Sequence, residues 1–172
     1  TLLSSLPGPR AIASTTMFAG TYTAIVTPFD ENQSVDFDAF EALIERQIAG
    51  GVDGIDPVGT TGESPALTRV EQTRLFAEIH DARLGKGSVV AGTGSNSTAE
   101  AVEYTEDAQE VGADAVLLVV PYYNKPTQEG LYLHFKAIAE STDLPCILYN
   151  VPSRTITNLS AETTIRLSQV PN

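Results

Sequence analysis

Hydroxyl and guanidinium side chains follow two apolar runs of this sequence. Thr60 and Thr61 stand in the segment Gly-Thr-Thr-Gly-Glu-Ser at 59–64, directly after the apolar run 54–58. Tyr149 and Arg154 stand in Tyr-Asn-Val-Pro-Ser-Arg-Thr at 149–155, at the end of the apolar run 146–149. A hydroxyl can bind a carboxylate or relay a proton, and the arginine fork matches a carboxylate. These residue types together indicate an enzyme that handles small carboxylates.

Each of these residues, taken alone, also fits a purely structural role. Threonines can satisfy backbone groups in a strand–helix connection, and the tyrosine and arginine can be a core and a surface residue. Glu63 precedes a helix, a place where a carboxylate serves the helix dipole more often than it serves as a general base. Lys125 is the only lysine in the loops that follow the strands, so it is the sole local candidate for Schiff-base chemistry. Its polar loop predicts solvent exposure rather than the desolvated amine that this chemistry needs.

Strand-like and helix-like segments alternate from residue 20 onward. The apolar runs are continuous, as expected when helices cover a parallel sheet. A residue able to cap a helix stands at the start of each helical pattern: Asp36, Thr68, Ser97, Thr127 and Ser160. Expected strands cover 22–26, 54–58, 89–91, 115–120 and 146–149, and expected helices cover 37–49, 68–84, 97–111, 127–141 and 160–168.

The repeat period of roughly 30 residues is the length of one strand–helix unit. This α/β pattern fits a doubly wound open sheet or a (β/α)8 TIM barrel, and both bind ligands at the carboxyl ends of their strands. Five units are present, whereas a closed barrel needs eight. The last helical pattern runs into the C-terminus at Asn172, so we expect the sequence to be a cut piece of a longer domain.

Composition excludes several classes of function. Apolar residues make up 42% and charged residues 19% of the chain, which is ordinary for a globular protein. The net charge of −12 argues against a surface for nucleic acid or for an anionic membrane, and no apolar run approaches the length of a membrane span. Cys146 is the only cysteine, so an intrachain disulfide is excluded. His80 and His134 have no partners at ligand spacing, so we expect no metal site.

The first 16 residues differ from the rest of the chain. They are rich in Ser, Thr, Leu and Pro and contain no acidic residue, which is compatible with part of a transit peptide. Pro7-Gly8-Pro9 disfavours the amphipathic helix of such a peptide. We therefore expect a disordered N-terminal extension over 1–16 and, over 17–172, the N-terminal part of a longer barrel domain. The lone cysteine fits a reducing compartment, so we expect a cytoplasmic protein, with a plastid location as the alternative that the extension leaves open.

Three motifs occur together in a characteristic order: Gly-Thr-Thr-Gly-Glu-Ser at 59–64, Pro-Tyr-Tyr-Asn-Lys-Pro at 121–126 and Tyr-Asn-Val-Pro-Ser-Arg-Thr at 149–155. In these motifs the chain, from about Met17 to its end, resembles the 4-hydroxy-tetrahydrodipicolinate synthase (dihydrodipicolinate synthase) family. The threonine pair and Val-Pro-Ser-Arg favour this family over the related N-acetylneuraminate lyases and sugar-acid aldolases.

The resemblance implies a TIM-barrel lyase of lysine and diaminopimelate biosynthesis. Such an enzyme condenses pyruvate with aspartate 4-semialdehyde through a lysine Schiff base, uses no dissociable cofactor, and is a homotetramer built as a dimer of dimers. By resemblance, Thr60, Tyr149 and Tyr123 form a proton relay, and Tyr123 reaches into the neighbouring subunit's site. Thr61 is implied to bind the pyruvate carboxylate, and Arg154 is implied to bind the semialdehyde carboxylate at the entrance.

Feedback inhibition by lysine occurs in part of the family. The residues that match positions of that inhibitor site are Ser64, Asn96, Glu100 and Tyr122. Arg69 and Gln72 depart from the histidines found there in some members. Glu100 also completes a capping-box pattern with Ser97, which is a structural alternative for it.

The family's Schiff-base lysine lies at the end of a sixth strand, and this chain ends at Asn172, before that strand. We therefore expect that the polypeptide as given cannot form the pyruvate imine. Two other functions stay open. One is a pyruvate-dependent sugar-acid lyase of the same superfamily. The other is a truncated, non-catalytic oligomerisation partner.

Overall fold

Five parallel strands form one sheet in the order in which they occur along the chain. The computed structural model describes residues 18–82 and 87–172. The order β1-β2-β3-β4-β5 lacks the reversal that a doubly wound sheet requires, so the barrel alternative is the correct one. The strands are β1 (Tyr22–Ala24), β2 (Gly54–Asp56), β3 (Ser88–Gly92), β4 (Ala115–Val119) and β5 (Cys146–Tyr149).

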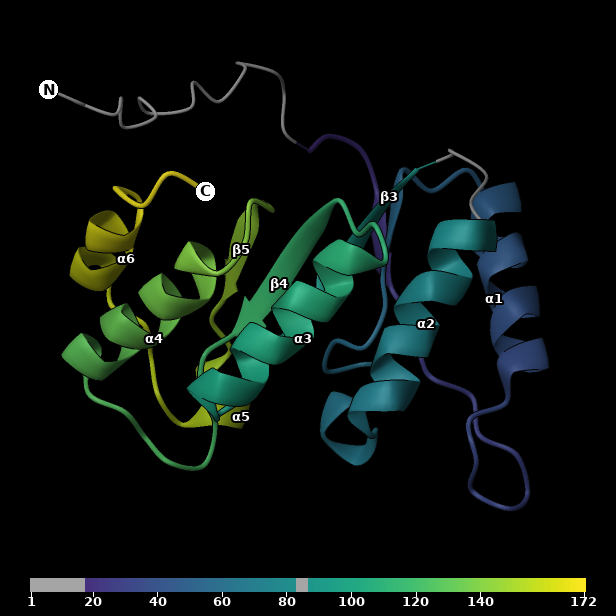
Figure 1. Ribbon diagram of the computed structural model, residues 1–172, viewed down its shortest axis with the longest axis horizontal. Helices are drawn as coiled ribbons and strands as arrows, with labels where there is room; N and C mark the ends of the chain where they lie inside the picture. The colour runs from purple at the N-terminus through teal and green to yellow at the C-terminus, as the bar shows by residue number, and fades with distance from the viewer. Residues whose placement is uncertain (1–17, 83–86) are drawn as a thin grey trace, which may run out of the picture.

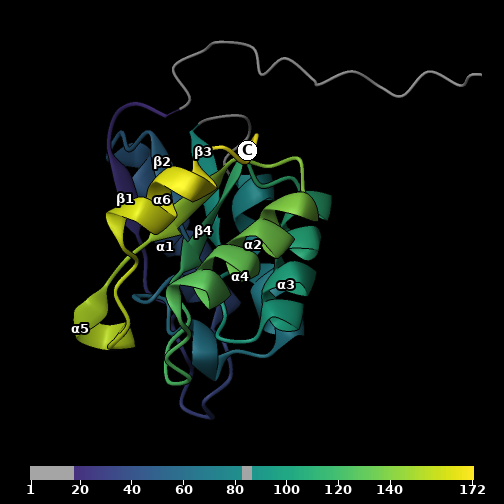
Figure 2. The same cartoon turned by 90° about the vertical axis from the view of Figure 1, so that its left-hand side faces the viewer.

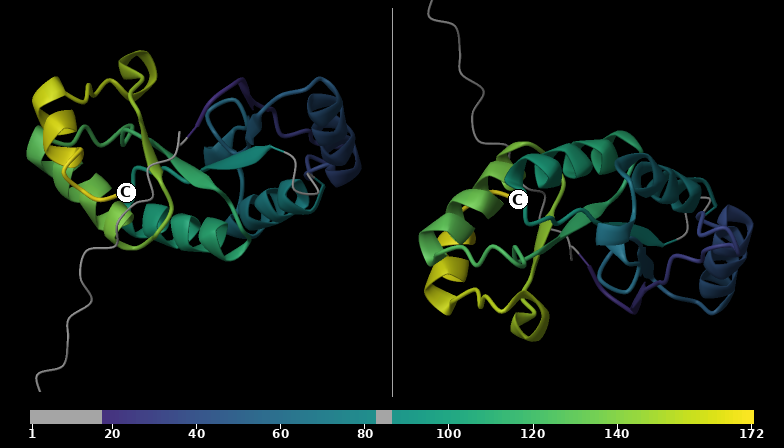
Figure 3. Two further views of the ribbon diagram at one scale, coloured as in Figure 1. Left: turned by 90° about the horizontal axis from the view of Figure 1, so that it is seen from above. Right: turned by 90° about the horizontal axis from the view of Figure 1, so that it is seen from below.

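The long helices cover one face of this sheet (Figure 1). Seen from above, they form an arc around the strands and leave the opposite face open (Figure 3). This is the arrangement of a TIM barrel in which helices surround a curved sheet, here over five strands. The helices are α1 (Phe37–Ala49), α2 (Arg69–Ala82), α3 (Thr98–Glu110), α4 (Gln128–Glu140) and α6 (Ala161–Leu167), with the short turns η1 (Ser64–Ala66) and α5 (Pro152–Thr155) between them.

The hydrophobic core lies between the helices and the sheet. Alternate residues of each strand point towards the helices, because successive side chains of a strand face opposite ways. Val116 and Leu118 of β4 are fully buried members of this core, whereas Leu117 and Val119 between and after them face the other side and line a pocket. Helices contribute large fully buried side chains, among them Phe40, Leu75, Phe76, Leu131, Phe135 and Ile138.

The predicted caps begin the helices at the expected places. Asp36, Ser97, Thr127 and Ser160 each accept a hydrogen bond from the backbone N–H three residues later. At α2, the Glu71 carboxylate accepts bonds from the Thr68 N–H (2.8 Å) and hydroxyl (2.7 Å), so a capping box forms there. The expected end of α2 near residue 84 and the extension over 1–16 lie outside the described residues.

Three local features differ from the sequence-based expectation. β2 ends at Asp56, two residues early, because Pro57 has no N–H to donate and Val58 has a positive φ of 58°. β1 likewise ends at Ala24 instead of Val26. The segment after β5 is not only a loop, since Pro152–Thr155 forms the helical turn α5.

The last residue of the chain contacts the free edge of the sheet. The Asn172 carbonyl oxygen accepts a hydrogen bond from Cys146 N–H at 2.8 Å. Its side-chain amide donates to the carbonyl oxygens of Ala139, Thr142 and Leu144. These bonds bring the backbone at Asn172 alongside the start of β5, which is the side on which a further parallel strand would pair.

The uncovered face and the strand edges lead us to expect self-association of the 172-residue chain. Val26, just beyond β1, is an apolar side chain with 52% of its surface exposed. We expect oligomers or aggregates in size-exclusion chromatography with light scattering, and less association in a Val26→Lys variant. Leu133→Lys is the matched control, because Leu133 is 56% exposed but lies on helix α4. A monodisperse monomer that melts cooperatively would contradict the expectation.

Candidate active site

The carboxyl ends of the strands meet at one edge of the sheet, where the short turns η1 and α5 also lie (Figures 1 and 2). A pocket of about 290 Å³ opens there, on the face of the sheet opposite to the core. Thr60, Ser64, Tyr122, Tyr149 and Arg154 line it. Residues separated by up to 94 positions in the numbering, from Thr60 to Arg154, therefore share one cavity.

The loop at 59–62 is a tight turn held against the sheet. Gly62 N–H donates to the Gly59 carbonyl oxygen at 3.1 Å, and the buried Thr27 hydroxyl donates to the Gly62 carbonyl oxygen at 2.7 Å. A side chain on Gly62 would come within 2.9 Å of the Val58 nitrogen, so the turn requires glycine there. Thr60 lines the pocket, and Thr61 is exposed in the same turn without being part of the pocket wall.

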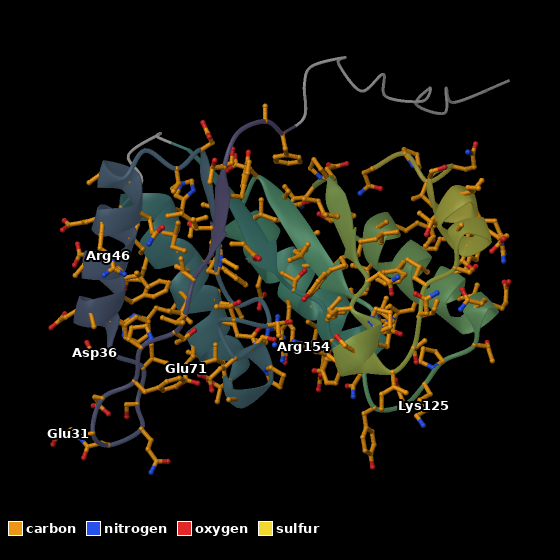
Figure 4. The ribbon with its side chains drawn as sticks, turned by 180° about the vertical axis from the view of Figure 1, so that it is seen from behind. Glu31, Asp36, Arg46, Glu71, Lys125 and Arg154 are labelled. Atoms are coloured by element: carbon orange, nitrogen blue, oxygen red, sulfur yellow. The ribbon has the colours of Figure 1, made fainter. Side chains whose placement is uncertain are left out.

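Tyr149 and Arg154 approach the pocket from the end of β5. Tyr149 is half-buried and pairs with Val119 in the β4–β5 register. Arg154 lies on α5, which Thr155 anchors by donating its hydroxyl to the carbonyl oxygens of Val151 and Thr157. Figure 4 shows Arg154 near the middle of the carboxyl edge. No ion pair to Arg154 occurs within residues 18–82 and 87–172, so its guanidinium can accept an anionic ligand.

The two tyrosines of the 121–126 loop point in different directions. Tyr122 is half-buried, and its carbonyl oxygen accepts bonds from the Asn96 side chain (3.1 Å) and from Asn124 N–H (2.9 Å). Burial raises the pKa of the Tyr122 phenol. Tyr123 is 87% exposed with a positive φ of 73°, and it does not line this chain's pocket. Its expected place in a neighbouring subunit's site stays a prediction.

A small hollow of about 50 Å³ beside the pocket contains part of the expected inhibitor site. Ser64 and Tyr122 line it. Asn96 and Glu100 do not line it, but each is hydrogen-bonded to a residue that does. Asn96 bonds the Tyr122 backbone, and the Glu100 carboxylate accepts a bond from the Ser95 hydroxyl at 2.8 Å. Glu100 therefore does not form the reciprocal half of the capping box, although Ser97 caps α3 as expected.

The two residues that depart from the family's histidines have structural partners here. Gln72 is buried and donates to the carbonyl oxygens of Ser64 (3.1 Å) and Leu67 (3.3 Å). Arg69 forms ion pairs with Glu103 and Asp107 of α3, both at 2.6 Å. These contacts join α2 to η1 and to α3 beside the hollow.

Lys125 is exposed, as predicted. It is a loop residue and has a positive φ of 48°. Figure 4 shows it at the same edge as Arg154 but displaced to one side, on the loop that leads to α4. Lys136 pairs with Glu140 across one turn of α4 at 3.5 Å. Neither lysine lines the pocket.

The described residues hold no other obvious catalytic centre. Within them, no group of three or more His, Cys, Asp or Glu could hold a metal ion, and no helix is long and apolar enough to cross a membrane. Burial raises the pKa of Cys146 to about 11 and lowers that of His134 to about 4, so at neutral pH both are uncharged. A larger hollow of about 800 Å³ between α4, α6 and the last residues contains none of the predicted site residues.

Asp56 does not line the pocket but lies beside Gly59, which does, and the sequence analysis did not single it out. It is the last residue of β2, and its Oδ1 is buried without a hydrogen-bond partner among the described residues. Burial raises the pKa of its carboxyl to about 7. A signal was available in the sequence, because this carboxylate interrupts an otherwise apolar run at 54–58. The run was interpreted as a plain buried strand.

Members of one protein family are similar to this chain. The sequence model of the Dihydrodipicolinate synthetase family matches residues 17–172. A 4-hydroxy-tetrahydrodipicolinate synthase from Dehalococcoides mccartyi is 61% identical over 150 residues, which cover 87% of this chain and 50% of the relative. The chain spans about half the length of the curated relatives it matches.

Solved structures of the same family share the fold. A chloride-inhibited dihydrodipicolinate synthase from Acinetobacter baumannii, complexed with pyruvate, matches with a TM-score of 0.86 at 52% identity, over 89% of this chain and 53% of that one. The enzyme from Cyanidioschyzon merolae with lysine bound matches with a TM-score of 0.86 at 46% identity, over 89% and 52% of the two chains.

The raised pKa of Asp56 predicts a pH-dependent stability. The folded chain holds the Asp56 proton more tightly than the unfolded chain, whose carboxyl has the ordinary value of 3.8. The free energy of unfolding should therefore fall as pH rises from about 4 to about 7 and level off above that, by on the order of 2–4 kcal/mol. Urea unfolding at several pH values measures this. Asp56→Asn should remove that part of the slope, and an unchanged slope would contradict the prediction.

Proposed function

Since this chain belongs to the dihydrodipicolinate synthetase family, we propose that it supplies the first five strand–helix units of a 4-hydroxy-tetrahydrodipicolinate synthase. The whole enzyme would be a lyase of lysine biosynthesis that condenses pyruvate with aspartate 4-semialdehyde through a lysine Schiff base. The observation that carries this proposal is the convergence of Thr60, Tyr149 and Arg154 on one pocket at the carboxyl edge of the sheet. The neighbour from Acinetobacter baumannii, which is complexed with pyruvate, supports the choice of the first substrate.

Thr60 and Tyr149 are proposed to move protons during formation and breakdown of the imine. When an amine adds to the pyruvate ketone, the resulting carbinolamine must gain a proton on oxygen before it loses water. Hydroxyls that line the same cavity can supply and recover that proton, because each is both a donor and an acceptor. Tyr123 would complete the relay in the neighbouring subunit's site, in a homotetramer that brings this exposed side chain against a second chain.

Two anionic groups must be bound, one on each substrate. We assign the pyruvate carboxylate to Thr61 and the tight turn at 59–62, whose N–H groups and hydroxyl can donate to it. Arg154 is assigned to the carboxylate of aspartate 4-semialdehyde, because its guanidinium is exposed and has no ion-pair partner in the described part of the chain. Both assignments place positive or hydrogen-bond donor groups where an anionic substrate would enter. Such groups can attract the substrate locally although the net charge of the chain is −12.

The nucleophilic amine is proposed to come from a part of the barrel that these 172 residues do not contain. Lys125 and Lys136 lie outside the pocket. A strand pairing beyond β5, where Asn172 already contacts Cys146, could bring a lysine to the open face. Lysine is further proposed to bind as an inhibitor at Ser64, Asn96, Glu100 and Tyr122, a proposal supported by the lysine-bound relative from Cyanidioschyzon merolae. The cytoplasm is the proposed location.

Imine trapping tests the assignment of the nucleophile. The 172-residue chain is incubated with pyruvate and borohydride and its mass is measured, and we expect no adduct. A fusion of residues 17–172 to the C-terminal half of the Dehalococcoides mccartyi relative should gain one reduced pyruvyl group. A covalent adduct on Lys125 of the 172-residue chain would overturn the assignment.

Substitution of Arg154 in the same fusion tests the second substrate. Arg154→Ala should raise KM for aspartate 4-semialdehyde by roughly 10- to 100-fold, as expected for the loss of a charge-assisted hydrogen bond to a carboxylate. KM for pyruvate should change little, which serves as the internal control. Assays with sugar-derived aldehydes separate the synthase from a sugar-acid lyase, because activity with those aldehydes alone would favour the lyase.

A further inference from the structure

Asp56 has no role in the reaction described above, yet it lies against the loop that binds substrate. Its Oδ2 is 3.2 Å from the position that a Cβ on Gly59 would take, and its Oδ1 is 3.4 Å from the same point. The carboxyl group therefore packs directly on the first residue of the turn at 59–62. Gly59 itself lines the pocket.

The direction of the Asp56 side chain follows from the alternation of β2. Ile55 belongs to the core beneath the helices, so Asp56 and Gly54 on either side of it face the opposite way. The Tyr22 ring occupies the space that a side chain on Gly54 would take, on that same face. Asp56 thus lies on the pocket face of the sheet. Along the strand direction it stands between Tyr22, which is paired with Gly54, and the turn at 59–62.

The surroundings of this carboxyl are apolar and contain no opposite charge. The register sets Asp56 beside Ala24 of β1, and Val90 follows Val89, the β3 partner of Ile55. Burial is the cause that raises the pKa of Asp56 to about 7, and no described residue donates a hydrogen bond to its Oδ1. A proton on this group therefore comes on and off near neutral pH.

We propose that Asp56 governs how tightly the turn at 59–62 holds a small anionic substrate, of the class of pyruvate. When Asp56 carries its proton, the threonine hydroxyls and the N–H groups that are not used inside the turn meet an incoming carboxylate without an opposing charge. When Asp56 loses its proton, a negative charge lies directly beneath Gly59 and repels that carboxylate. The assignment rests on the carboxylate-binding role of this turn in the proposed function, and Asp56 acts through the turn as a positioning residue.

The other titratable groups near Asp56 are few. From β1 the Tyr22 phenol faces the same side of the sheet, and β3 contributes Ser88 and Val90, which are uncharged. Asp53 precedes β2 at its far end, where its Oδ2 accepts a hydrogen bond from Thr21 N–H at 2.7 Å. Arg154 and Tyr149 line the pocket above the turn. Asp56 is therefore the carboxyl in closest contact with the turn among these groups.

Binding of pyruvate is tested in the fusion of residues 17–172 to the C-terminal half of the Dehalococcoides mccartyi relative, because the 172-residue chain is expected to self-associate. The imine-forming lysine of the fusion is replaced by alanine, so that only non-covalent binding is measured. Pyruvate is titrated against the amide NMR signals of residues 59–62, one unit below and one unit above the pKa of about 7. Pyruvate stays anionic at both pH values. We expect its affinity to be roughly five- to tenfold weaker at the higher pH, as one nearby negative charge at intermediate dielectric would produce. The side-chain carboxyl carbon signal of Asp56 should titrate over the same range.

Three variants make the test specific. Asp56→Asn and Asp56→Val, both uncharged, should bind pyruvate with affinities that differ by less than about twofold between the two pH values. Two variants are used so that the test survives a folding failure of either one, and the amide spectrum away from β2 reports whether each variant folds. Glu63→Gln is the matched control, since it removes an exposed carboxylate from the same loop and should retain the pH dependence.

The outcomes separate this proposal from the proposed function. An affinity of the fusion with Asp56 intact that is equal at both pH values, or a pH dependence that persists in the uncharged Asp56 variants, would overturn the role of Asp56 alone. A fusion and variants that show no pyruvate-induced shifts at 59–62 would overturn the carboxylate-binding role of the turn, and the role of Asp56 with it.

Discussion

Parallel hydrogen bonding between consecutive strands is the constraint on which this structure depends. Each strand pairs with the strand that precedes it in the chain, from β1 to β5, and a helix returns the chain to the same end each time. Because every strand runs the same way, all the carboxyl ends meet at one edge. Thr60 follows β2, Tyr122 follows β4 and Tyr149 ends β5, and for this reason the three share one pocket.

Close backbone packing at that edge holds the loops in place. A side chain on Gly92 at the end of β3 would come within 2.5 Å of the Val58 carbonyl oxygen, so the turn at 59–62 can lie directly over β3. The buried Thr27 hydroxyl bonds the same turn from the β1 side. These contacts hold the turn from two sides, so its backbone is fixed before a ligand binds.

Asp56 is a group beside the pocket that weakens the fold when it is ionised. A buried carboxyl without a hydrogen-bond partner is unfavourable when ionised, and an apolar residue would fit the apolar neighbours Ala24 and Val90 better. Such local conflicts tend to occur where function, rather than packing, selects the residue. The exposed guanidinium of Arg154 and the positive φ of Tyr123 are further features of this edge that packing alone does not explain.

The amino-acid sequence by itself determined the alternation of strands and helices, the residues that cap the helices, and the loops that carry the chemistry. These are local properties, since apolar periodicity, capping hydroxyls and turn residues act within a few positions of each other. The strand ends at Asp56 and Ala24 and the turn α5 were less predictable, because they depend on which backbone groups find partners in neighbouring strands.

The periodicity of the sequence left an open doubly wound sheet and a barrel both possible, and the family resemblance implied the barrel. The strand order of the tertiary structure confirmed the barrel, because that order is set by pairing between distant segments. It also decided which site residues meet. Tyr149 and Arg154 line the pocket with Thr60, while Thr61 and Tyr123 lie outside its wall. Burial and orientation made the difference at Asp56 as well, since the sequence shows a carboxylate in an apolar run but not which face of the sheet it takes. The face of the sheet that a side chain takes, its burial and its hydrogen-bond partners are set only when distant strands pack together.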